Sequence, residues 1–293
     1  EELMRKNEIV DLLVGCGLEA YKDRIAPLIF PSYQIHLDPD EDADIPMGAS
    51  KIGGEPDLPA DVEWPKWKHY TMSFVAQINL AELTDAAPLP ADGLLSFFYA
   101  VEAMYEDEDF YRDPRTCRVI YTPAERLGGL ERRSCGELSK DAVFRPNRAT
   151  FTPTLTVPAA ESAYLENMGL GWRGNREDFD KYWDVFLRRY SEHHETGAIV
   201  HRLLGHPDQI QGDMQVGCEA KTSGLDFDAL RNPDLYQRTV QSAIRWRLLL
   251  QIDSEDDKTG IMFGDVGRIY FWIREDDLAK RRFDRVVCEM QCS

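Results

Sequence analysis

The sequence lacks the features by which a membrane protein or a common class of enzyme is recognised. It holds no apolar run near the ~20 residues that a transmembrane helix needs, no Gly-x-Ser-x-Gly nucleophile motif and neither glycine pattern that binds nucleotide phosphates. Its six cysteines are scattered, and no Cys or His residues have the spacing of a zinc site. A chain of 293 residues needs no disulfides to fold, so we expect reduced and mostly buried thiols.

Basic residues are also scarce. The chain has 34 Lys and Arg against 52 Asp and Glu, which gives a formal net charge of −18. Such a charge repels nucleic-acid phosphates and anionic lipid, and no basic stripe offsets it locally. We therefore expect no nucleic acid and no membrane as partner, and a basic protein surface or a small molecule instead. No apolar signal region follows Glu1–Lys6, so we expect a cytoplasmic location.

What is present predicts a packed mixture of helices and strands. Hydrophobic residues make up 43% of the chain, enough for a sizeable core. Apolar residues recur at helical spacing before Gly15 and over residues 176–195, and a single helical turn is expected at 275–280. Strands are expected at 33–37, 72–80, 93–101, 118–121, 151–157, 246–253, 267–273 and 286–292. Antiparallel-type strands with non-alternating helices predict an α+β fold.

Two parts of the chain resemble each other. The matching segments are 74–79 with 248–253 and 54–57 with 205–208. Gly93 lies sixteen positions after Gln77, and Gly267 lies sixteen positions after Gln251. A buried Gln needs hydrogen-bond partners, so we expect each Gln to hold a loop or a ligand. The pattern predicts an internal duplication; the alternative is two ordinary hairpins that happen to align.

The repeat suggests a division of the chain. We expect an N-terminal helical segment at residues 1–32 and two α+β halves at residues 33–175 and 176–293. Each half would contribute an antiparallel sheet with flanking helices, and the two related halves would share one compact unit.

Several long runs are similar to the YwqG-like family of bacterial proteins, a domain of unknown function. These runs are 51–59, 74–80, 201–208, 211–214, 248–253 and 264–273. The resemblance covers nearly the whole chain and implies a bacterial cytoplasmic protein with an α+β fold. It supplies no catalytic residues. Some relatives lie among toxin–immunity genes, which implies a protein-binding role.

The richest polar cluster falls in a loop punctuated by Gly and Pro. If the two halves fold alike, this loop approaches the second hairpin, and carboxylates, an imidazole and a guanidinium would share one pocket suited to acid–base chemistry or ligand capture. The candidate ligand-binding residues are Gln77, His206, Asp208, Gln211, Asp213, Gln251, Asp265 and Arg268. The alternative is structural, since Asp in Gly-rich turns often caps backbone amides and Asp265 could pair with Arg268.

An acidic loop invites comparison with a calcium site. Four Asp residues alternate from 38 to 44, as in the first part of a calcium-binding loop. Ala43 stands where such a loop requires Gly, and Ala49 stands where it requires a bidentate Glu. We therefore expect a solvated acidic loop, with neither a metal nor a cofactor.

Two functions fit these observations. The first is a non-catalytic binding module that recognises a protein partner through its acidic surface. The alternative is an enzyme or a small-molecule-binding protein that uses a polar cleft between the two halves.

Overall fold

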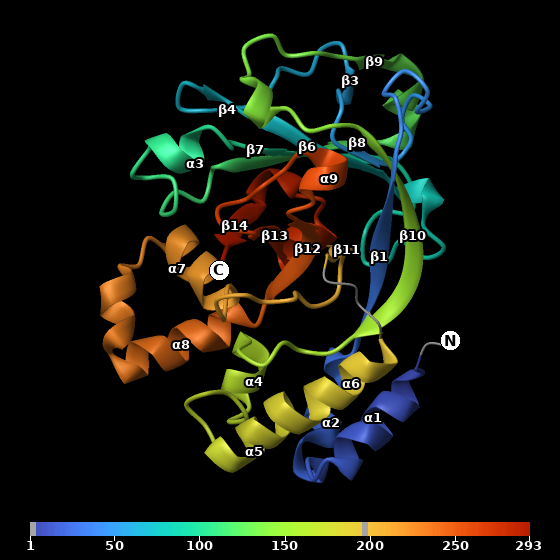
Figure 1. Cartoon of the computed structure of the whole chain (residues 1–293). Coiled ribbons are helices and arrows are strands. Elements are labelled where there is room, and N and C mark those ends of the chain that lie inside the picture. Colours follow the sequence, from blue (N-terminus) through green and yellow to red (C-terminus); the bar gives the residue numbers. More distant parts are fainter. Residues whose placement is uncertain (1–3, 195–198) are drawn as a thin grey trace.

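A ten-stranded antiparallel sheet, curved until it is nearly closed, dominates the computed structural model (Figure 1). The structure describes residues 4–194 and 199–293. The strands of this sheet are β1 (Phe30–Pro39), β2 (Lys51–Ile52), β6 (Ser73–Asn79), β7 (Leu94–Tyr99), β8 (Cys117–Thr122), β10 (Asn147–Thr156), β11 (His201–Leu203), β12 (Trp246–Asp253), β13 (Arg268–Arg274) and β14 (Val287–Gln291). Two short ribbons pair β3 (Asp57–Pro59) with β9 (Leu130–Arg132) and β4 (Lys66–Trp67) with β5 (Tyr70–Thr71). The expected mixture of helices and antiparallel strands is confirmed.

The centre of the sheet is the pair formed by β1 and β10. The two strands run antiparallel over their full length, from Phe30 opposite Thr156 to Pro39 opposite Asn147. On its other side β1 pairs with β11, and β10 pairs with β2. The central pair therefore joins a first quartet (β2, β6, β7, β8) to a second quartet (β11, β12, β13, β14).

The two quartets share local details. The register shifts between Phe74 and Ala76 in β6, and between Leu248 and Leu250 in β12. The bulged residues accept equivalent backbone hydrogen bonds, from Gly53 N to Val75 O (2.9 Å) and from Leu204 N to Leu249 O (3.0 Å). The donor loops have positive φ at Gly53 (75°), Gly54 (76°), Leu204 (60°) and Gly205 (81°). A bulge adds one residue to a strand, so strict alternation of faces does not hold through these strands.

The main core fills the inside of the curved sheet. Buried side chains from both quartets meet there, and the rings of Phe97 (β7) and Phe271 (β13) lie 5.2 Å apart in an edge-on contact. Removing this apolar surface from water is the main stabilising contribution to the fold. The quartets therefore depend on one another for their core.

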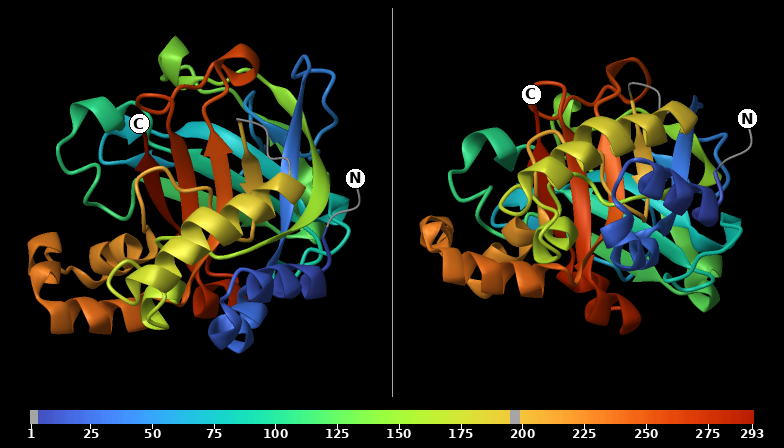
Figure 2. Two further views of the ribbon diagram at one scale, coloured as in Figure 1. Left: turned by 60° about the horizontal axis from the view of Figure 1, so that its bottom comes forward. Right: turned by 90° about the horizontal axis from the view of Figure 1, so that it is seen from below.

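Helices cover one end and one flank of the sheet (Figures 1 and 2). They are α1 (Lys6–Gly15), α2 (Lys22–Ile25), α3 (Ala103–Glu106), α4 (Ala163–Asn167), α5 (Arg176–Asp180), α6 (Arg188–His193), α7 (Gln215–Ser223), α8 (Pro233–Ala243), α9 (Asp256–Thr259) and α10 (Glu275–Ala279). A π-helical segment, Lys181–Leu187, connects α5 to α6. Ile9, Leu13, Tyr182 and Phe186 form a second core among the N-terminal helices and this segment.

The expected elements are present with small changes at their ends. The helix expected over 176–195 runs continuously from Arg176 to His193, and residue 195 lies outside the described residues. Helices α7 and α8 were not expected, although Asn232 caps α8 by accepting a hydrogen bond from Leu235 N and Pro233 occupies its first position. Within the part of the chain that the structure describes, no helix is both long and apolar enough to cross a membrane.

Gly205→Ala should destabilise the fold, because Gly205 has a φ of 81° and an added Cβ would lie 2.4 Å from Thr156 Oγ1. A left-handed conformation alone costs an alanine roughly 1–2 kcal/mol, and the close contact adds to it. Thermal unfolding should show a fall of several degrees in the midpoint. Gly128→Ala is the matched control, because its Cβ would meet nothing within 4 Å. Equal midpoints for the two variants would contradict this account.

Candidate functional site

Two buried glutamines hold the two loops that resemble each other in sequence. Gln77 accepts a hydrogen bond from Asp57 N (2.9 Å) and donates to Ala49 O and Asp57 Oδ2 (both 2.8 Å). Gln251 accepts from Asp208 N (2.9 Å) and donates to Val200 O (2.9 Å) and Asp208 Oδ2 (3.1 Å). We call each arrangement a Gln–Asp bracket. Both glutamines are fully buried, and each uses its carboxamide to fix one loop aspartate.

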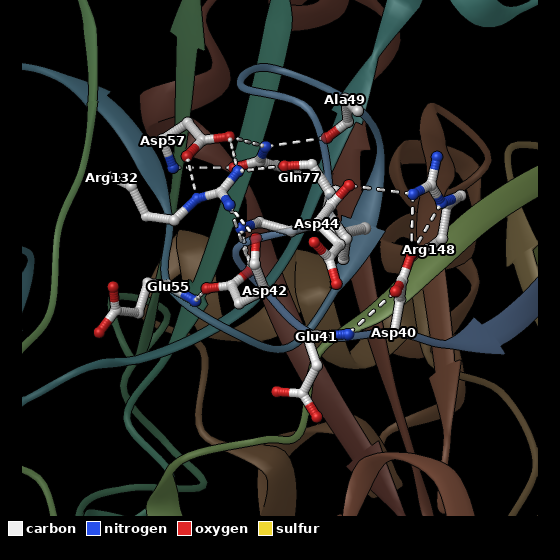
Figure 3. A network of polar contacts seen from close by, with 12 residues as sticks. Asp40, Glu41, Asp42, Asp44, Ala49, Glu55, Asp57, Gln77, Arg132 and Arg148 are labelled. Atoms are coloured by element: carbon white, nitrogen blue, oxygen red, sulfur yellow. Dashed lines mark hydrogen bonds and ion pairs between the residues drawn. The ribbon is translucent and has the colours of Figure 1, made fainter.

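The bracket in the first quartet is closed. Asp57 is fully buried, and Arg132 contacts both of its carboxylate oxygens, Nε to Oδ1 (2.8 Å) and Nη2 to Oδ2 (3.1 Å). Gly48 N donates a further hydrogen bond to Oδ2 (2.8 Å). Burial acts to raise the pKa of Asp57, but the hydrogen bonds from Arg132, Gly48 N and Gln77 outweigh it, and the pKa lies below its ordinary value. The Asp57 side chain is fully shielded from solvent, and Figure 3 shows its contacts with Arg132 and Gln77.

The acidic loop at 38–44 belongs to the same closed network. Asp42 accepts from the buried Lys51 Nζ (2.7 Å) and from Glu55 N (2.8 Å). Arg148 donates to Asp40 (2.7 Å), and Figure 3 shows this contact. The expectation of a solvated acidic loop is therefore corrected for Asp40 and Asp42, which form ion pairs with Arg148 and Lys51, whereas Asp38 and Asp44 are exposed. Within residues 4–194 and 199–293 no group of His, Cys, Asp and Glu side chains has the arrangement of a metal site.

The bracket in the second quartet is open. Arg202 Nε (3.3 Å), Arg202 Nη2 (2.8 Å) and Gln251 Nε2 all donate to Asp208 Oδ2. Asp208 Oδ1 accepts no hydrogen bond from the described residues, and the side chain is 34% exposed. Burial acts to raise the pKa of Asp208, but Arg202 and Gln251 outweigh it, and the pKa lies below its ordinary value. The carboxylate is therefore ionised at neutral pH and keeps one oxygen available.

That oxygen belongs to a residue lining a cavity of about 560 Å³. The cavity lies between β1, β10, the helical segment ending in α6, and the loop from His206 to Gly212. Cross-strand pairing places Thr152 opposite Gln34, Gln34 opposite Arg202, and Arg202 opposite Gln251. Directly opposed residues share one face of a sheet, so this polar row lies beside Asp208.

Two more lining groups have unused hydrogen-bonding capacity. His194 Nδ1 lies 3.1 Å from Tyr190 O, so Nδ1 carries the proton and Nε2 presents a lone pair. Nε2 is buried and has no partner among the described residues. Burial, partly opposed by the Tyr190 carbonyl, lowers the pKa of His194 and keeps the imidazole neutral near pH 7. The half-buried carboxamide of Gln34 also makes no hydrogen bond within the described parts of the chain.

His206 lines the cavity but is locked in place. Its ring stacks on Phe30 at 4.6 Å, and Nε2 donates to Leu28 O (2.7 Å). Burial lowers the pKa of His206 to about 3, so the ring is neutral at all ordinary pH values. Its surroundings suit packing better than proton transfer.

Four other candidate residues form hydrogen bonds with backbone groups or ion pairs with other side chains. Asp213 caps α7 by accepting from Val216 N (2.8 Å) and Gln215 N (3.3 Å), and burial raises its pKa to about 7. Gln211 is exposed and accepts from Cys292 N (3.2 Å). Asp265 is exposed in a turn, where its carbonyl accepts from Ser293 N (3.1 Å). Arg268 donates to Asp253 Oδ2 (2.8 Å) and to Asp208 O (3.0 Å).

The structure therefore gathers part of the candidate set. Asp208, Gln251 and Arg268 form one connected group beside the cavity, and His206 lines it. Gln77 holds the other bracket, and Gln211, Asp213 and Asp265 lie outside this group. Sequence reasoning missed Gln34, His194 and Arg202. A signal existed for Arg202, because the spacing of 151 residues between Asp57 and Asp208 also relates the buried Lys51 to Arg202.

The chain matches the family model described as Domain of unknown function (DUF1963) over residues 50–292, and it belongs to that family. The matched region contains both Gln–Asp brackets but not β1, which contributes Gln34 to the cavity. No curated protein matches the chain.

Asp57→Ala should destabilise the protein more than Asp208→Ala. Removing one partner of a buried ion pair costs about 3–5 kcal/mol, and Asp57→Ala removes the carboxylate to which Arg132 and Gly48 N donate. The loss at Asp208 should be about 1–3 kcal/mol, because solvent entering the cavity can hydrate Arg202. Urea unfolding of both variants measures the difference. A larger loss at Asp208 would show that its bracket is as closed as the first one.

His206 should make the fold sensitive to acid. The unfolded side chain binds a proton near pH 6.5, whereas the folded one stays neutral down to about pH 3. The free energy of unfolding should therefore fall as the pH drops below 6.5, by up to ~1.4 kcal/mol per pH unit. His206→Phe keeps an aromatic ring over Phe30 and removes the titration, so its stability should fall less steeply between about pH 6.5 and about pH 4. Parallel curves for wild type and variant would refute the assignment.

Proposed function

We propose that this member of the family is a non-catalytic binding protein that captures a small polar molecule in the cavity beside Asp208. The observation that carries the proposal is the contrast between the two brackets. The same Gln–Asp geometry leaves Asp57 fully buried with both oxygens used, and it leaves Asp208 exposed to a cavity with one oxygen that accepts no hydrogen bond from the described residues. Gln251 and Arg202 fix this carboxylate in place, so a donor group of a ligand can bind its second oxygen without a further cost for ordering the side chain.

The unused groups define the chemistry of that ligand. Asp208 Oδ1 accepts hydrogen bonds, the carboxamide of Gln34 can accept and donate, and Arg202 is cationic. A molecule with an amine, hydroxyl or amide donor at one end and an acceptor at the other would satisfy them together. Since Asp208 and Arg202 carry opposite charges, a neutral or zwitterionic molecule suits the cavity better than a strong anion.

A protein partner is the second candidate function. The formal charge of −18 favours a basic protein surface and opposes nucleic acid. An enzymatic use of the same cavity is the third, because a neutral imidazole and a carboxylate both line it and such groups can transfer protons. Conversion of a bound ligand would distinguish this third case from simple capture.

We also infer three finer properties. The chain is a YwqG-like bacterial member of its family, as the six runs resembling that group suggest, and it acts in the cytoplasm. It arose by internal duplication, which the paired brackets, bulges and positive φ values support. Equivalence of β1 with β10 would move the boundary between the halves from residue 175 to a point before Asn147.

A ligand screen tests the cavity. Amino acids, amines, sugars and nucleotides are tested for a rise in the thermal midpoint; a ligand at about 100 times its Kd adds roughly 2.7 kcal/mol, which should raise the midpoint by roughly 5–10 °C. Asp208→Asn and Gln34→Ala should each weaken the response, and Asp141→Asn, the same change at an exposed position, should not. Calorimetry of the hit with each variant gives the change in Kd. A ligand whose affinity is unchanged in both cavity variants would show that it binds elsewhere.

A further inference from the structure

Two surface segments that meet outside the cavity expose large apolar side chains, and we call these side chains the apolar patch. It consists of four large side chains with high exposure: Tyr105 (69%), Tyr111 (47%), Met262 (46%) and Val266 (57%). The two tyrosines follow β7, whereas Met262 and Val266 lie in the turn before β13. Exposed apolar patches rimmed by polar residues mark interaction sites.

Specific contacts hold the two segments together. Gly264 N donates a hydrogen bond to Tyr105 Oη (3.2 Å), which joins the turn to the loop after β7. The Tyr111 ring packs edge-on against the buried Phe110 at 5.1 Å, and its pKa is raised by burial and by the neighbouring phenol of Tyr105. Tyr105 and Tyr111 are therefore held in place by contacts with Gly264 and Phe110.

The rim of the patch is acidic. Glu106, Glu108 and Asp265 are exposed, and none of them forms an ion pair within residues 4–194 and 199–293. Asp107 and Asp109 on the same loop both bind Lys68 (2.8 Å). Arg112 is the single basic residue between positions 103 and 113. The rim thus adds to the overall charge of −18 and offers carboxylates without counter-charges.

We propose that the apolar patch docks a basic protein that places an apolar side chain among Tyr105, Tyr111, Met262 and Val266 and surrounds it with Lys or Arg. Aromatic residues and Met are enriched at the centres of protein interfaces, and a polar rim excludes water from such a centre. The acidic rim selects the charge of the partner and speeds its approach. A second copy of this chain is disfavoured, because two surfaces of the same negative charge repel each other.

The proposal develops the protein-partner candidate and does not depend on the cavity. The probe is a short lysine-rich peptide with spaced phenylalanines, labelled for fluorescence anisotropy. Two matched peptides replace its lysines by glutamates or its phenylalanines by serines. Wild-type protein should bind the first peptide and bind each of the others at least about tenfold more weakly.

Variants of the protein locate the binding. Tyr105→Ser and Val266→Ser should each weaken the Kd about tenfold or more. Glu106→Gln combined with Asp265→Asn should flatten the salt dependence of binding, since screening acts on these charges. Phe227→Ser removes an exposed aromatic (46%) outside the patch and should leave the Kd unchanged.

Clear outcomes overturn the proposal. The proposal is refuted if the wild-type protein does not bind the first peptide, or if Tyr105→Ser binds it equally well. It is also refuted if the lysine–serine peptide binds as well as the first peptide, or if the wild-type protein forms concentration-dependent dimers. Gln34→Ala should retain peptide binding, and Tyr105→Ser should retain the small-molecule response. Failure of one function therefore leaves the other open to its own test.

Discussion

The buried carboxamide of Gln251 fixes the geometry on which the candidate site depends. Gln251 lies in β12 and donates to the carbonyl of Val200, the residue before β11. It also binds Asp208, in the loop after β11, through both the backbone N–H and the carboxylate. Such a carboxamide is costly to bury unless all its hydrogen bonds are made. The carboxamide of Gln251 makes three hydrogen bonds, two of them to Asp208. The position of Asp208 is therefore set by a buried residue of the sheet and not by the conformation of an exposed loop.

The Gln–Asp bracket of the first quartet shows how the same arrangement looks where the aspartate is fully buried. Gln77 holds Asp57 as Gln251 holds Asp208, but Arg132 from β9 covers the carboxylate and contacts both oxygens. No β9-like strand covers Asp208 among the described residues; Arg202 approaches from within the sheet and contacts one oxygen. One bracket therefore contributes mainly to stability, and the other places an ionised carboxylate on the wall of a cavity.

Much of the fold could be predicted from the sequence, because strands such as β6, β7, β12 and β13 carry long apolar runs. Helix α8 was not predicted, because its apolar stripe is short. Asn232 and Pro233, which are typical of a helix start, were the available signal. The order of the strands could not be predicted from the sequence. Strand β1 pairs with β11, which lies more than 160 residues away, and no local sequence pattern indicates that contact. The site was predicted in part for the same reason. Asp208 and Gln251 have a repeated motif, whereas Gln34 and His194 reach the cavity only through long-range pairing.

The distribution of charge sets the two proposed surfaces apart. In the cavity, Asp208 is matched by Arg202 and the nearby histidines are neutral, so the ligand is selected by the direction of hydrogen bonds. On the apolar patch, Glu106, Glu108 and Asp265 have no counter-charge among the described residues, so the net charge of the partner matters most. Screening by salt acts strongly on exposed charges and weakly on partly buried pairs. Recognition at the patch should therefore depend on ionic strength and recognition in the cavity should not, which allows one molecule to use both surfaces independently.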